Sequence, residues 1–147
     1  MQDPACILVA VDGSSSSDQA VDAAVLMAKS SGAVLDLLYV SYFDSETDDD
    51  AVERISWLPD SVAGSAAKAG QAILQHTAER IPEGIQTRMH QETGNPARKI
   101  VEFAEQKGSD MIVVGGRGLG LMERFLMGSV SQAVMEAAKC TVIVVKS

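Results

Sequence analysis

Residues 7–17 read ILVAVDGSSSS, and this stretch decides the fold. Its continuous apolar half, rich in β-branched residues, predicts a strand buried on both faces. Its Ser-rich half is typical of a loop that leads into a helix. An apolar spacing from Ala20 to Ala28 predicts an amphipathic helix ending at Gly32, and a second apolar strand covers Val34 to Val40. A strand, a helix and a strand in this order indicate a right-handed parallel crossover.

The same alternation continues to the end of the chain and predicts an open α/β sheet. We expect one domain over residues 1–147: five parallel strands in the Rossmann-like order 3-2-1-4-5, with helices on both faces and an acidic surface loop at about 44–56. The next elements are a helix from near Pro59 to Arg80, a half-exposed edge strand from Ile85 to Gln91 and a helix that begins at Asn95 and Pro96. A strand from Met111 to Val114, a helix from Ser129 to about Ala138 and a strand from Thr141 to Val145 complete the chain. In the last helix we expect four residues to face inward: Val130, Ala133, Val134 and Ala137.

The composition excludes several classes of function. The net charge of −8 argues against a basic nucleic-acid surface, so we expect no nucleic-acid partner. No apolar run approaches the roughly 20 residues that a membrane span requires, and the chain shows no signal peptide, so we expect a cytoplasmic protein without membrane association. Cys6 and Cys140 lie beside predicted core strands, which favours reduced thiols over a disulfide.

A glycine-rich loop gives the first indication of chemistry. The predicted strand Met111–Val114 runs into Gly115-Gly116-Arg117-Gly118, and Gly128-Ser129 then opens the last helix. Glycines allow the backbone to approach an anion, and the free N–H groups of a helix start attract phosphate. The alternative is that these glycines only turn the chain. Asp12, at the end of the first strand, is a ligand-binding carboxylate, a helix cap or both, and Ser129 combines the roles of cap and phosphate contact.

Stronger nucleotide and hydrolase signatures are absent from the sequence. It contains no G-x-x-x-x-G-K-[ST] loop, and no G-x-G-x-x-G follows the first strand. The two histidines, His76 and His90, form no close pair, and the serine run has no G-x-S-x-G pattern. The sequence therefore favours phosphate binding over a recognisable catalytic centre.

The chain resembles the universal stress protein family, in its ATP-binding branch. The resemblance rests on VAVDGS at residues 9–14, GNPA at 94–97, SDMIVVG at 109–115 and the spacing G-x2-G-x9-G-S from Gly115 to Ser129. Ala10 and Thr141 stand where proline is frequent in the family, and neither change removes a ligand donor.

This resemblance implies a set of binding residues for ATP and Mg²⁺. It places the backbone of Ala10, Val11 and Val40 around adenine, Asp12 against ribose or the metal-bridged phosphates, and Gly115 against ribose. The phosphates would be held by Gly118, Gly128, Ser129 and Val130. Arg117 would add a positive charge near the phosphates; the alternative is that Arg117 is a solvated surface residue. It also implies a homodimer formed through the last strand, Val142–Val145.

We expect a regulatory module of the stress response whose conformation or partner binding follows the bound nucleotide. Two alternatives remain open from the sequence. One is a slow Mg²⁺-dependent ATP hydrolase in which Asp12 and the metal position water. The other is an interaction protein whose nucleotide site is vestigial.

Overall fold

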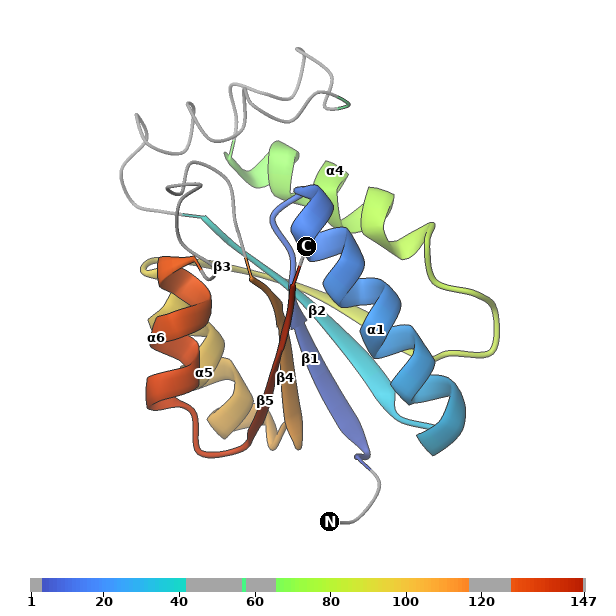
Figure 1. Cartoon of the computed structure of the whole chain (residues 1–147). Coiled ribbons are helices and arrows are strands. Elements are labelled where there is room, and N and C mark those ends of the chain that lie inside the picture. The colour runs from blue at the N-terminus through green and yellow to red at the C-terminus, as the bar shows by residue number, and fades with distance from the viewer. Residues whose placement is uncertain (1–3, 42–56, 58–65, 117–127, 147) are drawn as a thin grey trace.

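The sheet is parallel throughout and has the strand order β3-β2-β1-β4-β5, as the sequence predicts (Figure 1). The computed structural model describes residues 4–41, 57, 66–116 and 128–146. The elements are β1 (Cys6–Ala10), α1 (Ser15–Ser31), β2 (Val34–Ser41), α4 (Ala66–Ala78), β3 (Thr87–Thr93), α5 (Pro96–Lys107), β4 (Met111–Gly115), α6 (Ser129–Ala137) and β5 (Thr141–Val145).

Helices cover both faces of the sheet, so that the core has two halves. Helices α1 and α4 lie on one face and α5 and α6 on the other (Figure 1). Strand β1 contributes to both halves: Ile7 and Val9 belong to the first, whereas Leu8 belongs to the second, and all three are fully buried. The prediction that this strand is buried on both faces is therefore confirmed.

Local signals at the helix ends account for where the helices begin and end. Ser14 caps α1 by accepting a hydrogen bond from the Ser17 N–H at 3.2 Å, and Gly32 ends that helix with a left-handed φ of 76°. Asn95 caps α5 by accepting from the Arg98 N–H at 3.0 Å, and Pro96 occupies the first turn. The stop at Gly32 and the cap at Asn95 with Pro96 in the first turn were predicted from the sequence, whereas Ser14 was not singled out within the Ser-rich loop.

Three details differ from the prediction: the bounds of β3, the end of α4, which is Ala78 rather than Arg80, and the exposure of Ala137. Strand β3 begins at Thr87 and ends at Thr93, two residues later at each end than expected. Ala137 is exposed rather than inward, because α6 ends there and Ser131 and Val134 alone form its fully buried stripe. The predicted helix from Pro59 is described only from Ala66, and the acidic loop at 44–56 lies outside the described residues. None of the helices described is long and apolar enough to cross a membrane.

Candidate functional site

The candidate site lies where the strand order reverses, at the carboxyl ends of β1 and β4. These strands are neighbours in the centre of the sheet, with Val9 paired to Val113. The chain leaves β1 toward α1 on one face and leaves β4 toward α6 on the opposite face (Figure 1). Ligands of open α/β sheets bind in the crevice that such diverging loops create.

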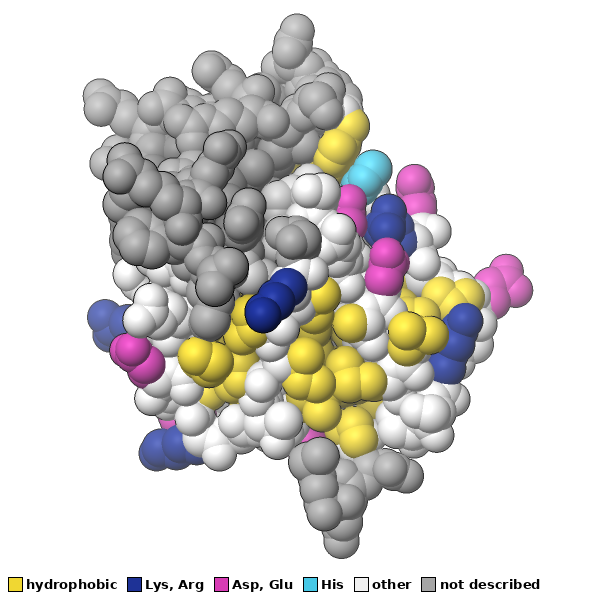
Figure 2. All heavy atoms as spheres, viewed as in Figure 1, with side chains coloured by type: hydrophobic (Ala, Val, Ile, Leu, Met, Phe, Trp, Pro, Cys, Tyr) yellow, Lys and Arg dark blue, Asp and Glu magenta, His cyan; other side chains and the backbone are white. Residues whose placement is uncertain are grey.

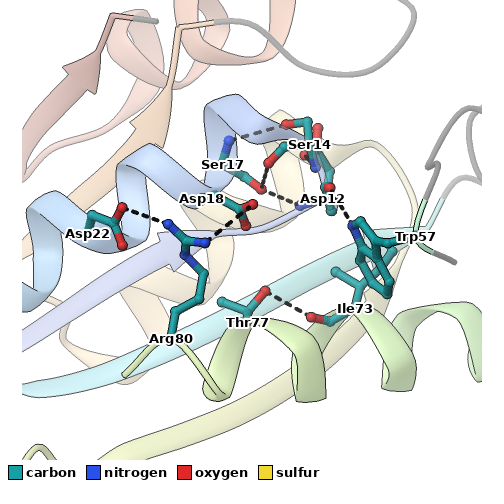
Figure 3. Close-up of polar contacts among 10 residues, drawn as sticks. Asp12, Ser14, Ser17, Asp18, Asp22, Trp57, Ile73, Thr77 and Arg80 are labelled. Atoms are coloured by element: carbon teal, nitrogen blue, oxygen red, sulfur yellow. Dashed lines mark hydrogen bonds and ion pairs between the residues drawn. The ribbon is translucent and has the colours of Figure 1, made fainter. Parts of the chain in front are cut away.

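Asp12 shapes the loop that follows β1. Its Oδ1 accepts a hydrogen bond from the Ser14 N–H at 2.9 Å, and Gly13 takes a left-handed φ of 84° (Figure 3). Ser17 Oγ donates to the Ser14 carbonyl at 3.1 Å and closes the turn. The prediction that Asp12 caps α1 is wrong, because the side-chain oxygen that caps this helix belongs to Ser14.

Three residues predicted around adenine or phosphate lie on the same face of the sheet. Ala10 ends β1, Val40 lies near the end of β2, and Val130 lies in the first turn of α6. All three are half-buried against the core under α5 and α6. Val11 points to the opposite core, and its N–H donates to the Leu38 carbonyl at 3.0 Å. The sheet thus uses the Val11 N–H, so a ligand cannot depend on that donor.

Gly115 is required by packing at this crevice. A Cβ built on Gly115 would lie 2.7 Å from the Ser16 carbonyl oxygen and 2.8 Å from the Ser16 carbonyl carbon. Because these atoms belong to the backbone of α1, they cannot rotate away. The first turn of α1 therefore lies directly on the end of β4, and only glycine fits between them.

The glycines at 116 and 128 join the two parts of the motif. The Gly128 N–H donates to the Gly116 carbonyl, while the Gly116 N–H donates to the Val145 carbonyl at 2.8 Å. The start of α6 is thereby attached to the ends of β4 and β5. Arg117 and Gly118, which fall between these glycines in the sequence, lie outside the described residues.

The amino terminus of α6 has the character of an anion site. Gly128 is its N-cap and supplies no side-chain hydrogen bond to the first turn. Ser129 is the first residue of the helix and is exposed, so the expectation that it caps α6 is wrong. Uncapped N–H groups at the positive end of a helix dipole are suited to phosphate oxygens.

Within the described part of the chain, no three His, Cys, Asp or Glu side chains gather closely enough to hold a metal ion. Asp12 is the carboxylate that borders the crevice. A single carboxylate is compatible with Mg²⁺, which commonly binds one or two carboxylates together with phosphate oxygens and water. The donor set thus fits a metal brought by a nucleotide better than a metal held by the protein alone.

The sequence profile of the universal stress protein family matches residues 6–146. The chain belongs to this family. A universal stress protein of Bacillus subtilis, YxiE, is 34% identical over 145 residues, covering 95% of this chain and 97% of the relative.

Two solved structures of universal stress proteins are similar over their whole length. UspA from Lactobacillus plantarum is 29% identical, with a TM-score of 0.72 and coverage of 99% of both chains. A universal stress protein crystallised in complex with cAMP is 30% identical, with a TM-score of 0.73 and coverage of 98% of both chains.

This universal stress protein has further residues beside the β1 loop that the sequence did not single out. The Trp57 indole donates to the Gly13 carbonyl at 3.3 Å (Figure 3). It also stacks on His76, with ring centroids 3.9 Å apart. Asp18, in the first turn of α1, lies 3.9 Å from Arg80. The contacts of Trp57 and Asp18 join segments far apart in the chain, so no local spacing in the sequence indicates them.

Proposed function

We propose that this universal stress protein binds an adenine nucleotide, ATP with Mg²⁺, in the crevice between the β1 and β4 loops. The observation that carries the proposal is the glycine-capped start of α6, which is attached to Gly116 beside the ends of β4 and β5. The relative crystallised with cAMP supports an adenine nucleotide as the ligand class.

In this proposal each part of the crevice contacts one part of the nucleotide. The half-buried carboxyl ends of β1 and β2, at Ala10 and Val40, receive adenine together with the Val11 backbone apart from its N–H, which the sheet already uses. Asp12 lies next to ribose and the metal, and Gly115 allows close approach. The phosphates extend toward Gly128, Ser129 and Val130, with Gly118 and Arg117 completing the phosphate contacts. Bound Mg²⁺ would neutralise phosphate charge in a chain whose net charge is −8.

We further propose that the bound nucleotide regulates the protein rather than serving as a substrate for rapid chemistry. Asp12 and Ser14 are hydrogen-bonded within the loop, and this arrangement supports a binding role for the loop. The bound nucleotide would act by favouring one conformation of the protein or one partner. A ligand shifts the equilibrium between two conformations only if it binds one of them more tightly than the other. The chain would work as a single nucleotide-binding domain in the cytoplasm, where its two free cysteines stay reduced.

The proposal is tested by calorimetric titration of the protein with ATP in the presence of Mg²⁺. Ser129→Ala removes an exposed hydroxyl at the helix start, so we expect binding to weaken by roughly tenfold with an unchanged melting temperature. Gly118→Val should weaken binding at least as much. Ser30→Ala is the matched control, because Ser30 is an exposed serine at the far end of α1. Wild-type protein that gives no heat with ATP, ADP, AMP or cAMP would overturn the proposal.

A further inference from the structure

We propose that Trp57 is a positioning residue of the nucleotide site, which raises nucleotide affinity by holding the loop after β1 in its binding geometry. The proposal rests on the function proposed above. The Trp57 indole N–H donates to the Gly13 carbonyl at 3.3 Å, from a position 44 residues away in the chain (Figure 3). Gly13 directly follows Asp12, the carboxylate that we place beside ribose and the metal ion. Trp57 therefore acts on the nucleotide through this loop.

The hydrogen bonds within the loop define its shape but are local. The Ser14 N–H donates to Asp12 Oδ1 at 2.9 Å, and the Ser17 N–H donates to Ser14 Oγ at 3.2 Å. Gly13, with a left-handed φ of 84°, lies between the first two of these residues and has the most conformational freedom, because it lacks a Cβ. A hydrogen bond to the Gly13 carbonyl thus restrains the turn at its most adaptable point and attaches it to a distant segment.

The indole that makes this bond is itself held against α4. It stacks on His76, with ring centroids 3.9 Å apart and an angle of 7° between the ring planes. It also packs against the half of the core that contains Ile73. Ile73 and His76 lie three residues apart on α4 and therefore share one side of the helix. In Figure 3 the indole lies between α4 and the loop, so that α4 supports the ring and the N–H serves the loop.

A loop held in this way binds more tightly than a loose one. Any ordering that the loop must undergo on binding is subtracted from the affinity, and a rigid support removes that cost. Gly13 is buried, so water replaces a lost donor at its carbonyl poorly. One neutral hydrogen bond changes an equilibrium constant by about three- to tenfold, which is the effect that we expect on nucleotide affinity.

Calorimetric titration of Trp57→Phe with ATP and Mg²⁺ tests the proposal. Phenylalanine keeps an aromatic ring against His76 but has no N–H, so ATP should bind about three- to tenfold more weakly than to the wild type. Thr77→Val is the matched control, because the Thr77 hydroxyl donates to the Ile73 carbonyl at 2.8 Å within α4. It removes a hydrogen bond from the supporting helix without changing the loop, and it should bind ATP as the wild type does.

A double variant shows whether the effect passes through Asp12. Asp12→Asn keeps an oxygen that can accept from the Ser14 N–H but removes the charge. If Trp57 positions that carboxylate, adding Trp57→Phe to Asp12→Asn should lower ATP affinity by no more than about twofold. A Trp57→Phe effect of the same size in both backgrounds would overturn the proposal.

Amide hydrogen exchange of the protein without nucleotide gives a measurement that does not depend on binding. The Ser14 N–H should exchange about three- to tenfold faster in Trp57→Phe than in the wild type, and at the wild-type rate in Thr77→Val. An unchanged Ser14 exchange rate in Trp57→Phe would overturn the proposal. Equal ATP affinity of Trp57→Phe and wild type would overturn it while leaving the nucleotide site in place, whereas a wild type that binds no nucleotide would overturn both.

Discussion

At the scale of single residues, Gly115 shows how packing can require the same residue as ligand binding. The Ser16 backbone fills the space where a Cβ would stand. We expect Gly115→Ala to lower the free energy of unfolding by about 1–3 kcal/mol, the usual range for overpacking, measured by denaturant titration. Adding Ser16→Ala removes the Oγ that would lie nearest to the new Cβ, but it should restore stability only in part, because the Ser16 carbonyl also obstructs the Cβ and belongs to the backbone. If Gly115→Ala is as stable as the wild type, the Ser16 backbone can move away from the added Cβ at little energetic cost.

Asp18 gives a second residue-scale prediction, concerning pH. Burial raises the pKa of its carboxyl, Asp22 and Asp12 raise it further, and Arg80 and His76 oppose the shift. One carboxylate oxygen, Oδ1, is buried without a partner among the described residues. Since the pKa in the folded state exceeds that in the unfolded state, protonation favours folding. This contribution is complete below the unfolded pKa of about 4 and is lost as the pH rises through the folded pKa.

Asp18→Asn should therefore raise the melting temperature near pH 7, and its advantage over wild type should shrink as the pH falls toward 4. Thermal melts across this range measure the difference. Asp22→Asn is the control, because Asp22 is the 2.8 Å partner of Arg80 and its neutralisation removes an ion pair. An advantage for Asp18→Asn that stays constant with pH would contradict the assignment.

At the scale of elements, a buried carboxylate attaches the edge strand β3 to the sheet. Asp36 of β2 is 1% exposed. It accepts hydrogen bonds from Arg88 Nε at 2.8 Å and Nη2 at 3.0 Å, and its Oδ1 lies 2.9 Å from His90 Nε2. Both partners belong to β3, whose side chains are mostly exposed. The ion pair thus compensates for the small apolar contribution of this strand.

Removing the two partners should have unequal effects. Arg88→Met leaves the Asp36 carboxylate buried without its bidentate partner, whereas Asp36→Leu leaves an arginine that can reach water. We expect the melting temperature of Arg88→Met to be the lower of the two, and the double variant to recover most of the loss. If Arg88→Met and Asp36→Leu have the same melting temperature, another group compensates the buried charge of Asp36 when Arg88 is absent.

The elements also show what the sequence could predict. Apolar runs, the cap at Asn95 and the stop at Gly32 are local signals, and they predicted the order of the strands and helices, although β3 lies two residues later than expected. Contacts across the sheet carry no local signal: neither the Ser16–Gly115 approach nor the clustering of Asp36 with Arg88 follows from spacing alone. One hint was available, because Asp36 is a charged residue inside an otherwise apolar strand and so requires a partner.

At the scale of the whole molecule, we propose that two copies associate through β5. This strand is a sheet edge, and Val142–Val145 are all half-exposed. Hydrophobic side chains gather on the face that carries it (Figure 2). An apolar, unpaired edge is a template for association with another strand.

Sedimentation velocity should show a dimer for the wild type and a shift toward monomer in Ile143→Glu, because the new charge would be buried at the interface. Met89→Glu is the matched control: Met89 is 50% exposed on the opposite edge strand, so its substitution should leave the dimer intact. Monomeric wild-type protein at micromolar concentration, or equal dissociation of both variants, would contradict the arrangement.

The hydrogen bond between Gly116 and Gly128 has a consequence for chain length. Because the Gly128 N–H donates to the Gly116 carbonyl, the two ends of the stretch between these glycines are held together within the fold. Doubling such a loop costs only about 0.6 kcal/mol in closure entropy, so folding scarcely discriminates between shorter and longer versions. The nine residues between Gly118 and Gly128 are therefore a spacing that the fold itself leaves free, and a bound phosphate chain is what would fix it.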